Sequence, residues 1–331
     1  MADDSYFREY RLRVENNLAQ RVLHRRTSPK LFSACTLTTS DTRGGRRLSA
    51  EPGSQPASRS GSVDSDIRRR MLSGLALAPA GANVIMQLSR LPVGRAVAES
   101  KAPGGSLSKH PVKRTRTTLG YIMIALFGSE REREVLRAEV NAQHRLVRSS
   151  EGDAVTYDAF DPDLQLWVAA CMYQGSLSAI GFLRGSPDDE ERDLLLTRCA
   201  RFATTLQVPA AMWPGDRAAF DRYWSTAVQH IGVDDVTREF LLGIASLSFL
   251  PRPLARVLGP PHLFLTSGFL PEPFRKELGL KWTPRQQAKF ERCTHALGAV
   301  NRHVPRSLRE FPWNVVEFDT RRRIRRGRSI L

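Results

Sequence analysis

Cysteine is scarce in this chain, and its few cysteines stand far apart. Four occur among 331 residues, at positions 35, 171, 199 and 293, and no two form a C-x-x-C pair. This spacing gives no support to a disulfide scaffold or a zinc ribbon. Cys171 and Cys199 fall in apolar helical patterns, which predicts small buried side chains in a reducing compartment.

We also expect no long apolar run to span a membrane, and on inspection of the sequence we take Gly74–Leu88 and Leu119–Phe127 as the two longest apolar stretches. Gly74–Leu88 is interrupted by a proline and two amides, and Leu119–Phe127 has about half of the roughly 18–20 residues that a membrane span needs. Tyr6–Arg26 alternates charged and apolar residues, unlike the apolar core of a signal peptide. We therefore predict a cytoplasmic protein without a transmembrane helix, and peripheral membrane contact stays open.

Common catalytic signatures are absent as well. The chain contains no G-x-G-x-x-G, no G-x-x-x-x-G-K-[ST], no H-E-x-x-H and no G-x-S-x-G. The usual motifs of nucleotide binding, zinc proteases and serine hydrolases are therefore excluded.

Positive charge is abundant but unevenly placed. The formal net charge is +16, from 50 basic and 34 acidic residues. Residues 1–63 hold 11 basic and 6 acidic side chains and residues 321–331 hold six arginines and no acid, which leaves +5 for residues 64–320. Because most of the charge lies in these two terminal segments, we expect it to serve solubility and loose association, and the small excess of residues 64–320 argues against a specific nucleic-acid surface.

The N-terminal region has the composition of a disordered segment. Between residues 40 and 63, 12 of 24 positions are Gly, Ser or Pro and none is aromatic, so little apolar surface can be buried. We predict a disordered basic arm over 1–63, a helical domain over 64–320 and an arginine-rich tail over 321–331. A short amphipathic helix over Phe7–Leu23, docked on a membrane or a partner, is the alternative for part of the arm.

The body shows helical periodicity and no strand-like alternation, which predicts an all-α, single multi-helix domain. We expect Pro251–Pro273, which is rich in proline, to be a connection. The expected helices are Arg68–Leu91 with a break near Pro79, Pro111–Phe127, Glu130–Arg148, Pro162 through Ile180, Asp188–Leu206, Asp216–Ile231, Asp234–Leu247 and Thr283–Asn301.

His144 lies on the apolar stripe of its expected helix, with Leu136, Val140 and Val147 at spacings of four, four and three. This spacing directs its imidazole into the body. Buried neutral imidazole is a ligand for a metal or for haem when it is suitably oriented, and it is otherwise a satisfied core histidine. Both interpretations stay open on the spacing alone.

Arg114, at the start of its expected helix, is a second candidate functional residue. Arg114, Thr118, Ile122 and Ala125 share one face, so a guanidinium and a hydroxyl stand beside an apolar surface. Such a pair suits an anionic group held by the forked donors of arginine. The alternative, a solvated basic first turn, is weakened because helix N-termini disfavour cations.

Several motifs in order carry a family resemblance. They are Gly81–Gln87, His110–Thr118, Asn141–Arg148, Tyr157–Trp167 and Gly268–Pro271. With these motifs, over about residues 64–331, the chain resembles an actinobacterial branch of the catalytic-domain family shared by rubber oxygenases (latex-clearing proteins) and the endoplasmic-reticulum-bound oxygenase of mycophenolic acid biosynthesis.

The resemblance implies an all-helical fold around haem b, with dioxygen as co-substrate. By similarity His144 is the proximal iron ligand, and Arg114 and Thr118 match the family's Arg-x-x-Lys-Thr motif. Thr117 stands where that motif has its lysine, so a lysine cannot be the distal ligand here. The distal site is then open, water-bound or filled by another group, and Thr117 is a candidate cofactor-binding residue. Glu99 is a loosely aligned candidate for a distal acid or base.

Three hypotheses follow for the function. The first is a haem-dependent oxygenase that acts on an apolar isoprenoid or lipid. The second is a non-catalytic helical module that contacts anionic lipid or nucleic acid through its basic tails. The third is a non-haem metal oxidoreductase in which His144 joins carboxylates.

Overall fold

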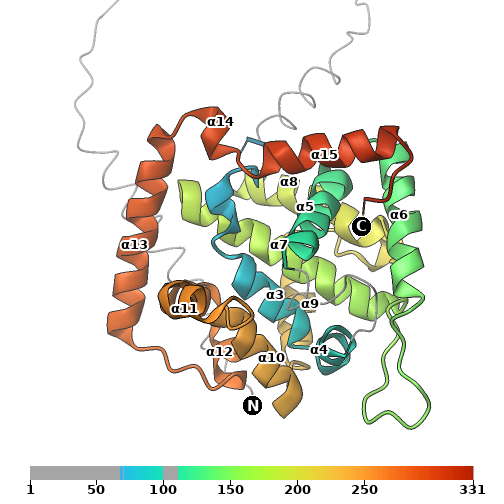
Figure 1. The fold of residues 1–331 in the computed structure, drawn as a ribbon, viewed down its shortest axis with the longest axis horizontal. Coiled ribbons are helices and arrows are strands. Elements are labelled where there is room, and N and C mark those ends of the chain that lie inside the picture. The colour runs from blue at the N-terminus through green and yellow to red at the C-terminus, as the bar shows by residue number, and fades with distance from the viewer. Residues whose placement is uncertain (1–67, 70, 100–110, 331) are drawn as a thin grey trace, which may run out of the picture. The chain divides into compact units, whose positions relative to one another are not determined.

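Helices make up nearly all the regular structure in the described part of the chain, which is residues 68–69, 71–99 and 111–330 of this computed structural model (Figure 1). In these ranges the only extended pairing is an isolated bridge between Arg148 and Asp158, so the all-α prediction is confirmed. The predicted disordered arm lies outside the described residues. The elements are η1 (Gly74–Leu77), α3 (Ala80–Leu88), α4 (Leu91–Ala98), α5 (Pro111–Phe127), α6 (Glu130–His144), α7 (Pro162–Arg184), α8 (Asp189–Thr204), η2 (Ala210–Met212), α9 (Arg217–Val228), α10 (Asp235–Ala245), α11 (Arg252–Phe269), α12 (Glu272–Glu277), α13 (Pro284–His303), α14 (Arg306–Arg309) and α15 (Trp313–Arg325).

Side-chain caps fix where many of the helices begin. The carboxylate of Asp161 accepts hydrogen bonds from the backbone N–H groups of Asp163 and Leu164, and Pro162 occupies the first turn of α7. Aspartates cap α8, α9 and α10 in the same way, and α13 begins with a capping box between Thr283 and Gln286. Each cap satisfies N–H groups that the first helical turn leaves without a partner.

Helix α7 is the centre of the bundle and packs against α3, α8 and α13. Its side chains Trp167 and Cys171 are fully buried. The stretch Pro162–Leu183, which our inspection of apolar segments overlooked, is long and apolar enough to cross a membrane by length and composition. Because 61% of its most apolar window is buried inside the protein, its hydrophobicity is accounted for by this central position.

The prediction of a proline-rich connection over Pro251–Pro273 is wrong for most of that range. Residues Arg252–Phe269 form α11, with Pro260 and Pro261 inside the helix. Each of these prolines removes one backbone donor. Packing against α3, α10 and α13, together with a 2.8 Å contact between His262 Nδ1 and the carbonyl of Ala245, holds the helix despite those lost bonds.

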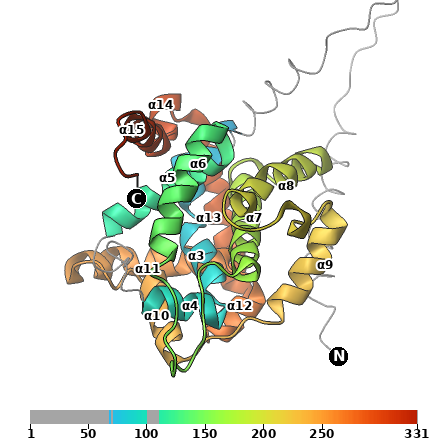
Figure 2. The same ribbon diagram turned by 90° about the vertical axis from the view of Figure 1, so that its right-hand side faces the viewer.

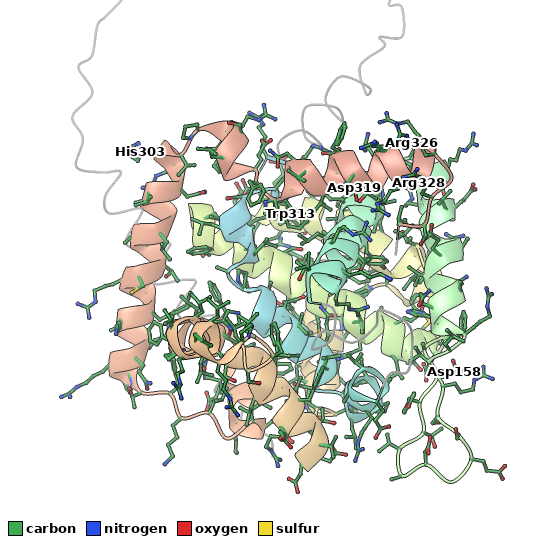
Figure 3. The ribbon with its side chains drawn as sticks, viewed as in Figure 1. Asp158, His303, Trp313, Asp319, Arg326 and Arg328 are labelled. Atoms are coloured by element: carbon green, nitrogen blue, oxygen red, sulfur yellow. The ribbon has the colours of Figure 1, made fainter. Side chains whose placement is uncertain are left out.

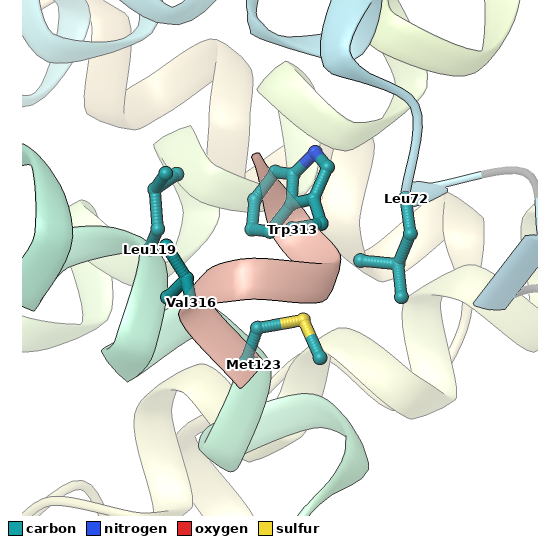
Figure 4. Close-up of a cluster of buried hydrophobic side chains, with 5 residues drawn as sticks. All are labelled: Leu72, Leu119, Met123, Trp313 and Val316. Carbon is teal, nitrogen blue, oxygen red and sulfur yellow. The ribbon is translucent and has the colours of Figure 1, made fainter. Parts of the chain in front are cut away.

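The C-terminal helix α15 packs on α5 through a small apolar cluster (Figure 4). The indole N–H of Trp313 also donates to the carbonyl of Ser73, 3.0 Å away. Figure 2 shows α15 nearly end-on above α5 and α6. The cluster consists of Leu72, Leu119, Met123, Trp313 and Val316.

The arginine-rich segment is part of this helix. The expected boundary between 320 and 321 falls inside α15, and residues Ser65–Leu331 belong to one compact unit. Arg321 pairs with Glu317 and Glu132, and Arg323 pairs with Asp319. Part of the positive charge that composition assigned to a tail is therefore neutralised by the folded body.

Candidate active site

His144 is the last residue of α6, four residues before the predicted end of that helix. The helix begins at a capping box between Ser129 and Glu132 and buries Leu136 and Val140 on the side that carries His144. The imidazole is partly buried, and its ring meets the ring of Phe160 edge-on at 6.1 Å between centroids. The apolar stripe therefore places His144 against the body, as the spacing predicts.

One ring nitrogen of His144 has no partner. Its Nδ1 is buried and makes no hydrogen bond to any residue that the structure describes. A buried polar atom left unpaired costs about 1–3 kcal/mol, and native proteins keep such a cost mainly where a function requires it. This orphaned nitrogen argues against the alternative of a satisfied core histidine.

The surroundings of His144 keep its imidazole neutral. Burial is the largest influence and lowers its pKa, the charge of Arg114 lowers it further, and the charge of Asp158 opposes both. A neutral imidazole has a lone pair available for a metal. The influence of Arg114 also shows that the two side chains expected to work together do lie near one another.

Arg114 lies in the first turn of α5 and keeps an exposed surface. The protein around it nevertheless desolvates the guanidinium enough to lower its pKa. Among the described residues no carboxylate pairs with Arg114, so its charge is available to an anionic group.

The two threonines that follow Arg114 have different surroundings. Thr118, one turn further along the same face, is exposed. Thr117 is buried, and its hydroxyl donates to the backbone carbonyl of Arg114 at 3.0 Å. The structure therefore brings Thr118 to the side of Arg114 and commits the hydroxyl of Thr117 to its own helix.

Glu99 is the C-terminal cap of α4 and forms an ion pair with Arg95. Arg95 in turn contacts Asp234 with a 2.5 Å separation of Nε and Oδ2. Glu99 also interacts with Tyr157, and together with burial it raises the pKa of that phenol. In the described residues no hydrogen bond or ion pair joins Glu99 to His144 or Arg114, and residues 100–110 lie outside the described ranges.

The segment between α6 and α7 contacts both His144 and Glu99. Asp158, labelled in Figure 3, pairs with Arg148 at 2.9 Å and lies in the same loop as Phe160 and Tyr157. Phe160 contacts the ring of His144 and Tyr157 reaches Glu99, so one loop links the ends of α4 and α6.

Sequence reasoning missed the residues that hold the end of α6. The side-chain amide of Gln207 donates to Asn141, one turn before His144, at 2.6 Å. Gln165 donates to Gln207 at 2.6 Å and to the carbonyl of Ala159 at 2.8 Å, and it accepts from the N–H of Gln207. Asn141 stands in a quoted motif, but its partners are distant in sequence and no local pattern identifies them.

Sequence reasoning also did not single out Arg90, a cation that forms no ion pair among the described residues. Its guanidinium lies 5.2 Å from the ring centroid of Trp167, and its Nε is buried without a hydrogen bond. The indole of Trp167 donates to the carbonyl of Gln87 at 2.9 Å. Arg90 therefore rests on the aromatic face of the central helix.

The donor atoms of this site suit a metal ion whose other ligands come from a bound cofactor and not from the protein. In the described ranges no group of three or more His, Cys, Asp or Glu side chains could hold a metal ion. The site offers one neutral imidazole, His144, and one unpaired guanidinium, Arg114. A group that combines a metal needing one protein ligand with anionic substituents would satisfy both.

Comparison with known proteins identifies the family of the chain. Residues 68–299 match the family model described as "ER-bound oxygenase mpaB/B'/Rubber oxygenase, catalytic domain". The chain is 44% identical over 250 residues to uncharacterized protein Mb2261 of Mycobacterium bovis and to uncharacterized protein Rv2237 of Mycobacterium tuberculosis. Each alignment covers 76% of this chain and 98% of the relative. No solved structure matches the chain significantly.

Proposed function

The chain belongs to the family of ER-bound oxygenase and rubber oxygenase catalytic domains, and from this premise we propose that it is a haem-dependent oxygenase acting on an apolar, isoprenoid- or lipid-like substrate. When bound, haem b supplies the iron chemistry that activates dioxygen, which the side chains of the protein cannot supply. The chain would contribute an imidazole ligand for the iron, an anchor for the carboxylates of the group, and control of protons and water.

The main support for the proposal is the environment of the His144 imidazole. Its imidazole is partly buried, held neutral by burial and by Arg114, and has an unpaired buried Nδ1. A core histidine would satisfy that nitrogen. In the proposal His144 is the proximal ligand, and the amide chain of Asn141, Gln207 and Gln165 fixes the helix end that presents it.

Arg114 is proposed to bind the negatively charged edge of the cofactor. Its guanidinium has no carboxylate partner among the described residues and stands near the proposed ligand. Thr118 shares its face and adds a hydroxyl donor. Thr117 contributes differently from the expectation, because its hydroxyl already donates to the carbonyl of Arg114 and so stabilises the turn that carries the guanidinium.

Glu99 is proposed to hold or move a proton at the edge of the site. Its carboxylate is shared between Arg95 and the phenol of Tyr157, so it is held in place as a hydrogen-bond acceptor at the end of α4. This is the most distant of the proposed roles, since no described contact joins Glu99 to His144.

The non-haem alternative has less support from the described residues. Asp158 is the acidic group whose charge acts on His144, and it is paired with Arg148. A non-haem iron site needs two or more further ligands, and the described ranges contain no such group. Haem needs one or two ligands from the protein because the porphyrin provides four nitrogens.

Oxygen consumption tests the function. The full chain, supplied with haem, is mixed with squalene as an isoprenoid probe, with oleic acid as a lipid probe, or with glycerol as a polar control. We expect oxygen uptake with at least one apolar probe, lost in His144→Ala and kept in His295→Ala, which changes an exposed histidine on α13. Equal uptake by the two variants would overturn the role of His144.

A further inference from the structure

Large apolar side chains are exposed along α14 and α15, which lie on one edge of the protein (Figure 1). Leu308 is 68% exposed and Phe311 is 59% exposed, and within α15 the exposed fractions are 55% for Val315 and 63% for Phe318. Soluble proteins expose single apolar residues commonly, but these four stand within residues 308–318, and such a concentration makes the segment a candidate interaction surface.

Helical spacing places arginines on the same outward side. Val315, Phe318, Arg322 and Arg325 follow one another at intervals of three, four and three residues, so they share one face of α15. All four are exposed. The opposite face, with Trp313, Val316 and Thr320, is buried against the body.

The exposed arginines are not neutralised by the protein. Arg322, Arg325, Arg326 and Arg328 form no ion pair in the part of the chain that the structure describes, unlike Arg321 and Arg323. Figure 3 shows Arg326 and Arg328 at the C-terminal end of α15. One end of this surface is therefore apolar and the other carries free positive charge.

We propose that this surface docks on an anionic lipid membrane. The α14–α15 face is defined here as Leu308, Phe311, Val315, Phe318, Arg322 and Arg325. A helix lying in a membrane interface buries its apolar side chains among the acyl chains, while arginines bind the lipid phosphates. The face has both parts, and the unpaired arginines select for negatively charged lipid.

Two other occupants fit this face less well. A second copy of the chain would have to cover the arginines of the face, and it would bring more arginines to the contact. A nucleic acid would pair with the arginines but would leave the four apolar side chains against a charged backbone. A lipid surface accommodates the whole face.

Vesicle co-sedimentation of the full chain tests the proposal. We expect binding to vesicles of phosphatidylglycerol and phosphatidylcholine, and little binding to phosphatidylcholine alone. The double variant Val315→Asp/Phe318→Asp should weaken that binding by about tenfold or more, because it removes apolar insertion and adds repulsion. The variant Arg322→Gln/Arg325→Gln should weaken it and reduce its dependence on salt.

A matched control distinguishes damage to the α14–α15 face from a general effect of added negative charge on vesicle binding. Leu254 and Val257 lie three residues apart on α11 and are 50% and 71% exposed, so Leu254→Asp/Val257→Asp makes the same double change elsewhere and should leave vesicle binding unchanged. His144→Ala should also bind vesicles normally, which separates this test from the test of the oxygenase. All the changed face residues are exposed, so circular dichroism should confirm an unchanged fold.

Several results would overturn the proposal. One is a full chain that does not bind the anionic vesicles, and another is a Val315→Asp/Phe318→Asp protein that binds them as the wild type does. A dimer in solution that this variant converts to monomer would assign the face to a second copy. Binding to a duplex DNA probe that the variant weakens equally would assign it to nucleic acid.

Discussion

The charge of Arg114 lies close enough to the imidazole of His144 to lower its pKa. The two residues are 30 positions apart, but α5 and α6 are joined by a turn at Gly128 and Ser129 and run antiparallel, so the start of one helix meets the end of the other. The hairpin of α5 and α6 thereby places His144, a potential metal ligand, near Arg114, a cation without a carboxylate partner among the described residues.

Removing the charge of Arg114 should raise the pKa of His144. In Arg114→Gln the repulsion is lost while burial remains, so the imidazole should protonate at higher pH than in the wild type, though still below its ordinary value. NMR titration of the His144 ring in the cofactor-free protein measures this. Arg145→Gln, which changes an exposed neighbour, is the matched control and should leave the titration in place.

The cofactor-free protein should lose stability in mild acid because of His144. Its folded-state pKa is below the ordinary value of about 6.5, so between those two pH values the unfolded chain binds more protons. The contribution is fully present above about pH 6.5 and is lost as pH falls toward the folded pKa.

Urea unfolding at about pH 7.5 and about pH 5.5 tests this, and His144→Ala should show a smaller loss between the two than the wild type. The exposed His230 provides the control variant His230→Ala. An unchanged acid loss in His144→Ala would show that His144 is not the group responsible.

The buried amide of Gln165 should be important for stability. Gln165→Leu leaves the N–H of Gln207 and the carbonyl of Ala159 without their partner, which should cost about 1–3 kcal/mol of the free energy of unfolding. The matched change Gln229→Leu, at an exposed position, should cost less than about 0.5 kcal/mol. Equal urea midpoints for the two variants would mean that the amide chain does not hold the end of α6.

Two glycine-to-alanine changes should have opposite effects. A Cβ at Gly74 would lie 2.1 Å from the backbone carbonyl oxygen of Phe311, so Gly74→Ala must displace the chain that leads into α15 and should destabilise by about 1–3 kcal/mol. A Cβ at Gly181, inside α7, would meet nothing within 4 Å, and Gly181→Ala should stabilise by about 0.5–1 kcal/mol. Thermal unfolding of both variants should show a lower melting temperature for Gly74→Ala and a higher one for Gly181→Ala than for the wild type.

Local signals in the sequence predicted much of the fold. Pro111 and Gly128 set both ends of α5, and Asp161 set the start of α7, because a cap or a helix stop acts over a few residues. The helix α11 was missed since Pro260 and Pro261 oppose a helix locally, and the packing that overrides them comes from distant segments.

The candidate site was predictable only in part. The apolar stripe and the family motifs singled out His144 and Arg114, whereas the commitment of the Thr117 hydroxyl to a backbone carbonyl depends on the rotamer that the folded helix adopts. The partners of Asn141 come from α7 and from the segment after α8, so only the tertiary structure reveals them.

The absorbance spectrum of the full chain, purified from cells supplied with a haem precursor, tests the central claim most directly. The account predicts a haem Soret band in the wild type and in His295→Ala, and its loss in His144→Ala with circular dichroism unchanged. A colourless wild-type protein, or a His144→Ala protein that keeps the band, would contradict the account.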